Sequence, residues 1–188
     1  QAMRFGIARG LFSNESGLGS AAIVAAAAST PNPVRQGLVA STGTFWDTVV
    51  VCALTGLVLV NSGAWTQGFN GAAMTNAAFE SLPVIGPMLL AVGLLTFVFS
   101  TILGWSYYGE RAIEYLGGPR VIPVYRWVWV GAVMVGSVMS LQVVWNFADI
   151  ANALMAIPNL IALLWLSRTL VDETRDYLWR DRLDQHVE

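Results

Sequence analysis

Hydroxyl side chains inside an apolar segment are the strongest candidates for chemistry in this chain. Ser100 and Thr101 belong to the segment Phe97–Arg111, which completes an apolar run that starts near residue 83. Hydroxyl oxygens are hard ligands that suit a small cation such as Na⁺, and helical spacing places Trp105 on the same stripe as Thr101. A simpler alternative is that each hydroxyl bonds to the carbonyl of the preceding turn, while Trp105 anchors the helix at a membrane interface. Spacing alone favours this alternative.

The composition indicates an all-helical integral membrane protein. The chain has 188 residues, of which 55% are hydrophobic and only 12% are charged, whereas soluble domains carry about 25% charged residues. Four apolar segments approach the roughly 20 residues that a membrane helix needs, and none shows the alternation of a barrel strand. These predicted spans are approximately 45–60, 84–107, 127–145 and 150–166. We expect one membrane domain over 1–188, with its four spans within 44–167.

The arginines predict how the spans are oriented. All ten basic residues are arginine, and they fall before the first span, between the second and third, and after the fourth. The first group consists of Arg4, Arg9 and Arg35. The positive-inside rule places all three groups in the cytoplasm, which an even number of spans allows. Residues 1–43 are then the cytoplasmic end of a helix plus a loop, and residues 168–188 are a cytoplasmic tail. Both chain ends are expected on the cytoplasmic side of the cell membrane.

Two carboxylates near span ends are further candidates. Asp149 lies between Asn146 and Asn152 at three-residue steps, which indicates a polar network close to a membrane span. The fourth span starts here, so an N-cap at the positive end of the helix dipole explains Asp149 more simply. Asp47, at the start of the first span, receives the same interpretation. Residues 146–149 are expected to form a tight hairpin between the third and fourth spans.

The sequence argues against several other classes of protein. The only histidine, His186, lies in the tail, so no Ser/His/Asp arrangement is present and no enzyme is expected. The single cysteine, Cys52, excludes an internal disulfide. Basic residues form no patch of the kind that binds nucleic acid.

A specific string near the start carries a family resemblance. The string Arg-Gly-Leu-Phe-Ser-Asn-Glu-Ser-Gly-Leu-Gly-Ser spans residues 9–20 and resembles the hallmark of the sodium:alanine symporter family, also described as alanine or glycine:cation symporters. Further stretches are similar to that family in the same order, so the resemblance covers essentially the whole chain. They are 33–37, 47–52, 100–111, 148–161 and 172–177.

The resemblance implies a LeuT-like transporter fold of two inverted five-helix repeats. This chain would be the second repeat, from the end of core helix six to core helix ten. The resemblance makes Ser100 and Thr101 ligands of Na⁺, and it makes Thr101 and Trp105 contacts of the substrate. It gives a motif at the cytoplasmic end of helix six a gating or structural role, through Phe12, Ser13, Asn14, Glu15, Gly17 and Gly19.

The implied function is Na⁺-coupled symport of a small neutral amino acid, such as alanine or glycine, by alternating access. Its implied partners are the lipid bilayer, the substrate, and a missing N-terminal half that carries the rest of both sites. The alternatives are a membrane subunit that serves assembly without transport, and a transporter coupled to H⁺.

Overall fold

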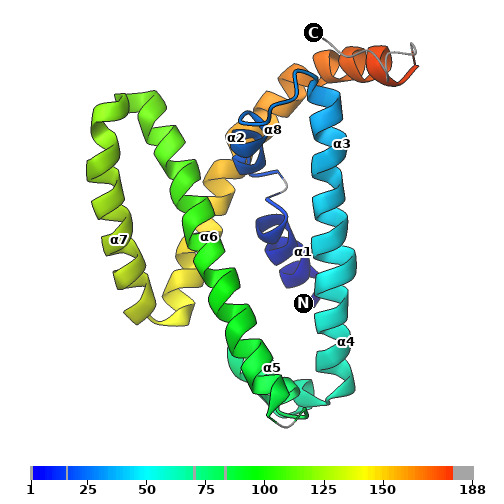
Figure 1. Ribbon diagram of the computed structural model, residues 1–188, viewed down its shortest axis with the longest axis vertical. Coiled ribbons are helices and arrows are strands. Elements are labelled where there is room, and N and C mark those ends of the chain that lie inside the picture. The colour runs from blue at the N-terminus through cyan, green and yellow to red at the C-terminus, as the bar shows by residue number, and fades with distance from the viewer. Residues whose placement is uncertain (1, 16, 70, 83, 180–188) are drawn as a thin grey trace. The chain divides into compact units, whose positions relative to one another are not determined.

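The computed structural model describes residues 2–15, 17–69, 71–82 and 84–179, so His186 and the last residues of the chain lie outside the described part. Helices dominate the described residues (Figure 1). They are α1 Ala2–Ser13, α2 Ser20–Ala25, α3 Pro33–Thr44, α4 Ala53–Asn61, α5 Ala72–Phe79, α6 Ile85–Gly117, α7 Ile122–Val138 and α8 Leu141–Trp179. Shorter π and 3₁₀ segments are η1 Phe45–Cys52, η2 Ala64–Thr66 and η3 Pro119–Val121. Two compact units form, one from Gln1–Phe45 with Met134–Glu188 and the other from Trp46–Val133.

Among the described residues, four helical segments are long and apolar enough to cross a membrane, in agreement with the predicted number. They are Pro33–Asn61, Ile85–Gly117, Pro119–Val138 and Leu141–Trp179. Large apolar side chains on them face outward: Leu95 is 72% exposed and Trp165 is 84% exposed. Water-soluble proteins rarely expose continuous apolar surface on this scale. The described part of the chain therefore has the surface of a membrane protein.

The first span begins earlier than the sequence predicted. Asn32 caps it, because its Oδ1 accepts a hydrogen bond of 2.9 Å from the Arg35 amide, and Pro33 occupies the first turn. Residues 33–44 are rich in small and polar side chains, which hid this half of the helix from a hydropathy pattern. Asp47 consequently lies in the middle of a continuous helical segment, so its interpretation as an N-cap was wrong.

The turn between the third and fourth spans was also misplaced. It occurs at residues 139–140, and α8 begins at Leu141. Asn146 accepts a hydrogen bond of 3.0 Å from the Gln142 side chain one turn earlier, so its polarity is satisfied within the helix. Asp149 lies two turns inside α8 and pairs with Arg9, so Asp149 is not an N-cap.

A cluster of charges joins α6 to α7 in the second unit. Glu110 has a side chain that is only 12% exposed, and it accepts hydrogen bonds from Arg126 Nε at 2.7 Å and from Arg111 at 3.0 Å. The Tyr125 hydroxyl donates to the Ser106 carbonyl at 3.2 Å. Gly109 allows this contact, because a Cβ there would overlap the Tyr125 hydroxyl. These interactions fix the α6–α7 hairpin.

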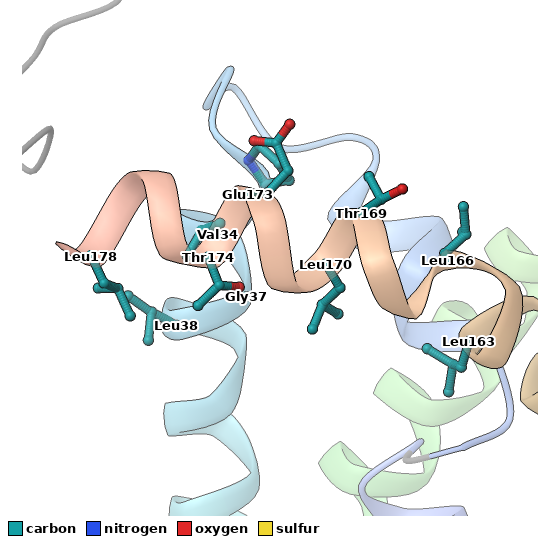
Figure 2. Close-up of a pocket in the computed structure, with 11 residues that line it drawn as sticks. Val34, Gly37, Leu38, Leu163, Leu166, Thr169, Leu170, Glu173, Thr174 and Leu178 are labelled. Atoms are coloured by element: carbon teal, nitrogen blue, oxygen red, sulfur yellow. The ribbon is translucent and has the colours of Figure 1, made fainter. Parts of the chain in front are cut away.

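In the first unit, the segment from α1 to α3 runs alongside α8. Arg9 contacts Asp149 near the start of α8, and Gly19 lies against Asn159 ten residues further along. The start of α3 then faces the last turns of α8 across an apolar groove of about 440 Å³, where Leu38 lies near Leu178 (Figure 2). The order of these three contacts shows that the two segments run in the same direction.

This parallel course separates two arginines that the sequence analysis grouped together. Arg9 lies beside the start of α8 and the first turns of α3 lie beside its end, so Arg9 and Arg35 belong to opposite ends of α8. Arg9 is also paired with Asp149, and a count of arginines along the sequence does not detect such a pairing. The cytoplasmic orientation of the chain ends stays a prediction.

We expect Glu110→Gln to lower the melting temperature of the purified protein in detergent by several degrees. The substitution leaves Arg111 and Arg126 facing a neutral amide, so the three hydrogen bonds that they donate to Glu110 are no longer made to a carboxylate. Arg120→Gln is the matched control, because Arg120 is exposed and forms no ion pair among the residues that the structure describes. Equal melting temperatures for the two variants would contradict a structural role for the cluster.

Candidate functional site

In the first unit, the helical path is interrupted between the end of α1 at Ser13 and the start of α2 at Ser20. Three residues in this interruption have positive φ: Glu15 at 52°, Gly17 at 79° and Gly19 at 82°. Glycine adopts this conformation without steric cost, whereas Glu15 adopts it against its usual preference. The backbone therefore leaves the helical path at the string Ser13–Gly19, which the sequence analysis identified as a motif.

The interruption lies at the middle of the apolar part of α8. Between Asp149 and Arg168, α8 carries no charged residue over a length of about 27 Å, close to the thickness of a bilayer's hydrocarbon core. Asn159 is near the centre of this stretch, and a Cβ on Gly19 would lie 3.2 Å from its Oδ1. The motif was expected at the cytoplasmic end of helix six. The structure places Gly19 beside the middle of this uncharged stretch, and the depth of the motif in the membrane stays a prediction.

Polar groups gather around the interruption. Pro158 lacks an amide hydrogen, so the Leu154 carbonyl one turn earlier loses its helical partner. Ser20 is only 2% exposed, and its hydroxyl has no hydrogen-bond partner among the described residues. Irregular backbone at membrane depth occurs where it is buried in protein or lines a cavity, and in transporters such segments bind ions and solutes. The arrangement is suited to holding a small polar ligand.

A cavity of about 340 Å³ extends between α1 and α8 from this level. Leu18 and Phe12 line its apolar part, and Arg4, Asp149 and Asn152 line its polar part. Its size falls within the range of about 300–1,000 Å³ that is usual for small-molecule sites. The structure thus brings Asp149 and Asn152 together on one cavity wall, in agreement with their spacing in the sequence.

Sequence reasoning missed the partner of Asp149, which is Arg9. Arg9 donates to the Asp149 carboxylate through two nitrogens, at 2.6 Å and 3.4 Å. The Arg9 guanidinium also lies 3.7 Å from the centroid of the Trp145 ring, within the range of a cation–π interaction. Arg9 and Asp149 are 140 residues apart in the sequence. No local pattern in the sequence signals this contact.

In the second unit, Ser100 and Thr101 share one backbone partner. Ser100 Oγ donates to the Phe97 carbonyl at 2.9 Å, and Thr101 Oγ1 donates to the same carbonyl at 2.8 Å. A hydroxyl that donates its hydrogen still has lone pairs that can accept or coordinate. These are the hydrogen bonds to a carbonyl of the preceding turn that the simpler alternative expected. They leave lone pairs on both hydroxyl oxygens that could bind a cation.

The half-buried Trp105 lies one turn after Thr101 on the same helix. Its ring makes an edge contact with Tyr108, with centroids 5.6 Å apart. This contact limits how the indole can turn. Trp105 and the two hydroxyls belong to the second unit, whereas the interrupted helix, Asp149 and Asn152 belong to the first.

Asp47 gains importance from its position in the structure. It lies within the π-helical segment Phe45–Cys52, near the middle of the span Pro33–Asn61. A carboxylate at this depth is costly and usually functional, and π-helical turns within helices often mark functional sites. Sequence reasoning placed Asp47 at the start of the span because the first half of this helix is weakly apolar.

Comparison with known proteins gives the same family along the whole chain. A model of the sodium:alanine symporter family matches residues 1–188. An uncharacterized transporter of Haemophilus influenzae is 51% identical over 99% of this chain and 41% of its own length. The sodium/alanine symporter AgcS of Methanococcus maripaludis is 50% identical over 94% of this chain and 40% of its own length. The probable sodium/glutamine symporter GlnT of Bacillus subtilis is 39% identical over 94% of this chain and 37% of its own length.

These matches bear on one expectation and establish the family. The first relative aligns with 99% of this chain, so the match gives no support to the expectation of a separate N-terminal half as a partner. The chain spans 41% of that relative's length. The match over all residues, together with the interrupted helix and the four apolar helices, leads to one conclusion. The chain belongs to the sodium:alanine symporter family.

Proposed function

We propose that this protein carries out Na⁺-coupled symport of a small neutral amino acid, such as alanine or glycine, across the cell membrane. The observation that carries the proposal is the interrupted helix at the mid-depth of α8, with a cavity of about 340 Å³ beside it. A zwitterionic amino acid needs polar groups of both signs, and Arg4 and Asp149 line this cavity. The family and its sodium/alanine relative support the choice of ion and solute.

The proposed ion site uses oxygen atoms of α6. Ser100 and Thr101 would coordinate Na⁺ through the lone pairs that their hydrogen bonds to Phe97 leave available. Thr101 and Trp105 would also contact the substrate. The motif Phe12, Ser13, Asn14, Glu15, Gly17 and Gly19 has a gating role in this proposal, because it forms the interruption.

Transport would proceed by alternating access within a LeuT-like inverted-repeat fold. Na⁺ and solute together would bind a closed state more tightly than an open one, so their binding energy shifts the population toward closure. The two ends of α8 would define the cytoplasmic and outer sides of the protein. Arg35 and the end of α8 would face the cytoplasm, while Arg9 and the start of α8 would face outward.

Two other functions make different predictions. A subunit that serves only membrane assembly needs no solute cavity. A transporter coupled to H⁺ needs a group that titrates inside a span, and the position of Asp47 within the π-helical segment favours this candidate over the assembly role.

We expect Thr101→Val to raise the Na⁺ concentration for half-maximal alanine uptake about tenfold or more. Valine keeps the shape of threonine but removes an oxygen that would bind a charged ligand, a loss of about 1.5–3 kcal/mol. Thr96→Val is the matched control on the same helix, because the Thr96 hydroxyl also bonds to a carbonyl of the preceding turn, at 2.9 Å. The proposed ion site is wrong if both variants retain the wild-type Na⁺ dependence.

Trp105→Ala should raise the KM for alanine about tenfold or more while the protein still reaches the membrane. The indole supplies a large contact surface, and truncation of such an aromatic anchor typically costs 2 kcal/mol or more, by the rough scale for binding sites. Trp127→Ala is the control, because Trp127 is 79% exposed on α7. Uptake of radiolabelled alanine by cells that express the full-length protein measures both.

The coupling ion is tested by replacing Na⁺ with choline during uptake. Na⁺ coupling predicts that uptake falls to background and that a protonophore has little direct effect when the Na⁺ gradient is imposed. Coupling to H⁺ predicts the reverse, with Asp47→Asn abolishing uptake because an amide does not titrate. Uptake that depends on neither ion would reject symport.

A further inference from the structure

An apolar groove between the start of α3 and the end of α8 has no role in the proposed transport. Its volume is about 440 Å³, and among the described residues only these two helices contribute to its walls. Aliphatic side chains line most of it, namely Val34, Leu38, Leu163, Leu166, Leu170 and Leu178. A surface of this kind is stable against hydrocarbon, because water hydrates it poorly.

The groove extends from the apolar part of α8 into its amphipathic end. Leu163 belongs to the uncharged stretch of α8 that ends at Arg168, whereas Leu170 follows Arg168. Beyond Arg168, Leu170 extends to one side of the helix, and Thr169 and Glu173 extend to the opposite side (Figure 2). A helix with such faces lies at the boundary between lipid headgroups and acyl chains. The groove therefore joins the acyl region of a membrane to the headgroup level.

Two arginines follow one rim of the groove. Arg168 and Arg175 are seven residues apart, close to two helical turns, so they share one side of α8. A second pocket, of about 320 Å³, is lined by Arg175 and Trp179 and shares Thr174 with the groove. In the part of the chain that the structure describes, neither arginine forms an ion pair. Tryptophan favours the headgroup level, so this rim offers two guanidinium groups to an anion at that depth.

The acidic residues nearby leave this rim positively charged. Glu173 also lines the groove, but two residues along a helix correspond to about 200° around its axis, so Glu173 and Arg175 are on opposite sides. Asp172 is one turn from both arginines, and among the described residues it forms an ion pair with neither. The same spacing from Leu170 turns Asp172 away from the groove. Arg168 and Arg175 therefore outweigh the one carboxylate on their stripe.

We propose that the groove binds one anionic phospholipid, with an acyl chain between α3 and α8 and the phosphate at Arg168 and Arg175. A guanidinium binds phosphate through two parallel hydrogen bonds. Phosphatidylglycerol supplies that phosphate with a neutral glycerol beyond it, whereas phosphatidylcholine brings a trimethylammonium charge toward the arginines. The bound lipid ties the start of α3 to the end of α8, and the site does not depend on transport.

The test is lipid binding to the purified full-length protein, counted by native mass spectrometry. Phosphatidylglycerol and phosphatidylcholine with the same acyl chains are titrated separately into the protein in detergent. We expect phosphatidylglycerol to bind saturably. Phosphatidylcholine should bind at least about fivefold more weakly, the effect of one charge near such a surface.

Arg168→Gln together with Arg175→Gln should weaken phosphatidylglycerol binding about 25-fold. Each arginine near an anionic lipid contributes about a fivefold gain in affinity, and the two gains multiply. Arg120→Gln is the matched control, because Arg120 lies on η3 and does not line the groove. It should leave the affinity unchanged.

Two glycines of the first span test the groove itself. Gly37 lines the groove and Gly43 does not, and a Cβ at either position meets no neighbouring atom within 4 Å. Leucine favours a helix more than glycine does, so both leucine variants should fold. Gly37→Leu should weaken phosphatidylglycerol binding about tenfold, the effect of excluding roughly two methylene groups of the acyl chain. Gly43→Leu should leave the affinity unchanged.

Equal affinity for the two lipids would overturn the anionic assignment. Absence of saturable lipid binding, or unchanged binding in Gly37→Leu or in the double arginine variant, would overturn the site. Another segment of the full-length protein would then be the occupant of the groove. None of these measurements requires transport, so rejection of the proposed symport would leave the lipid site standing.

Discussion

The hydrocarbon core of a membrane supplies no water, so each polar group within it must find a partner in the protein. This constraint explains most of the local structure. Hydroxyls of Thr96, Ser100 and Thr101 donate to carbonyls of their own helix, and the Gln142 side chain donates to Asn146. The constraint also explains why the interruption lies against Asn159 of α8. A bare break in a helix would be too costly in lipid, and this one is tolerated because it adjoins protein and a cavity.

The ion pairs of the two units differ in how far the protein shields them. In the α6–α7 hairpin, Glu110 is shielded and bonded to Arg111 and Arg126, which ties the two helices together. Arg9 and Asp149 meet where both side chains remain partly exposed. The alternating access that we propose would need rigid elements that move against each other around a solute, and the α6–α7 hairpin is suited to be one of them.

Some of the fold could be read from the sequence. The apolar runs predicted four spans, and the described part of the chain has four helices of the required length and hydropathy. The boundaries were less predictable. The polar first half of the helix that starts at Pro33 lowered its hydropathy, and Asn146 together with Asp149 imitated a loop inside α8. Both errors have one cause, since polar side chains satisfied within a helix resemble loop residues in a linear pattern.

The sequence by itself determined the family, the membrane class, and the spacing that puts Asp149 with Asn152 and Thr101 with Trp105. Only the tertiary structure decided that the interrupted motif lies against Asn159 and that Arg9 lies against Asp149. Those features depend on contacts such as Arg9 with Asp149, which are 140 residues apart. Periodicity reports which side chains share a face of one helix. It contains no information about which helix that face meets, and the pairing of charges across two helices is settled only when they pack.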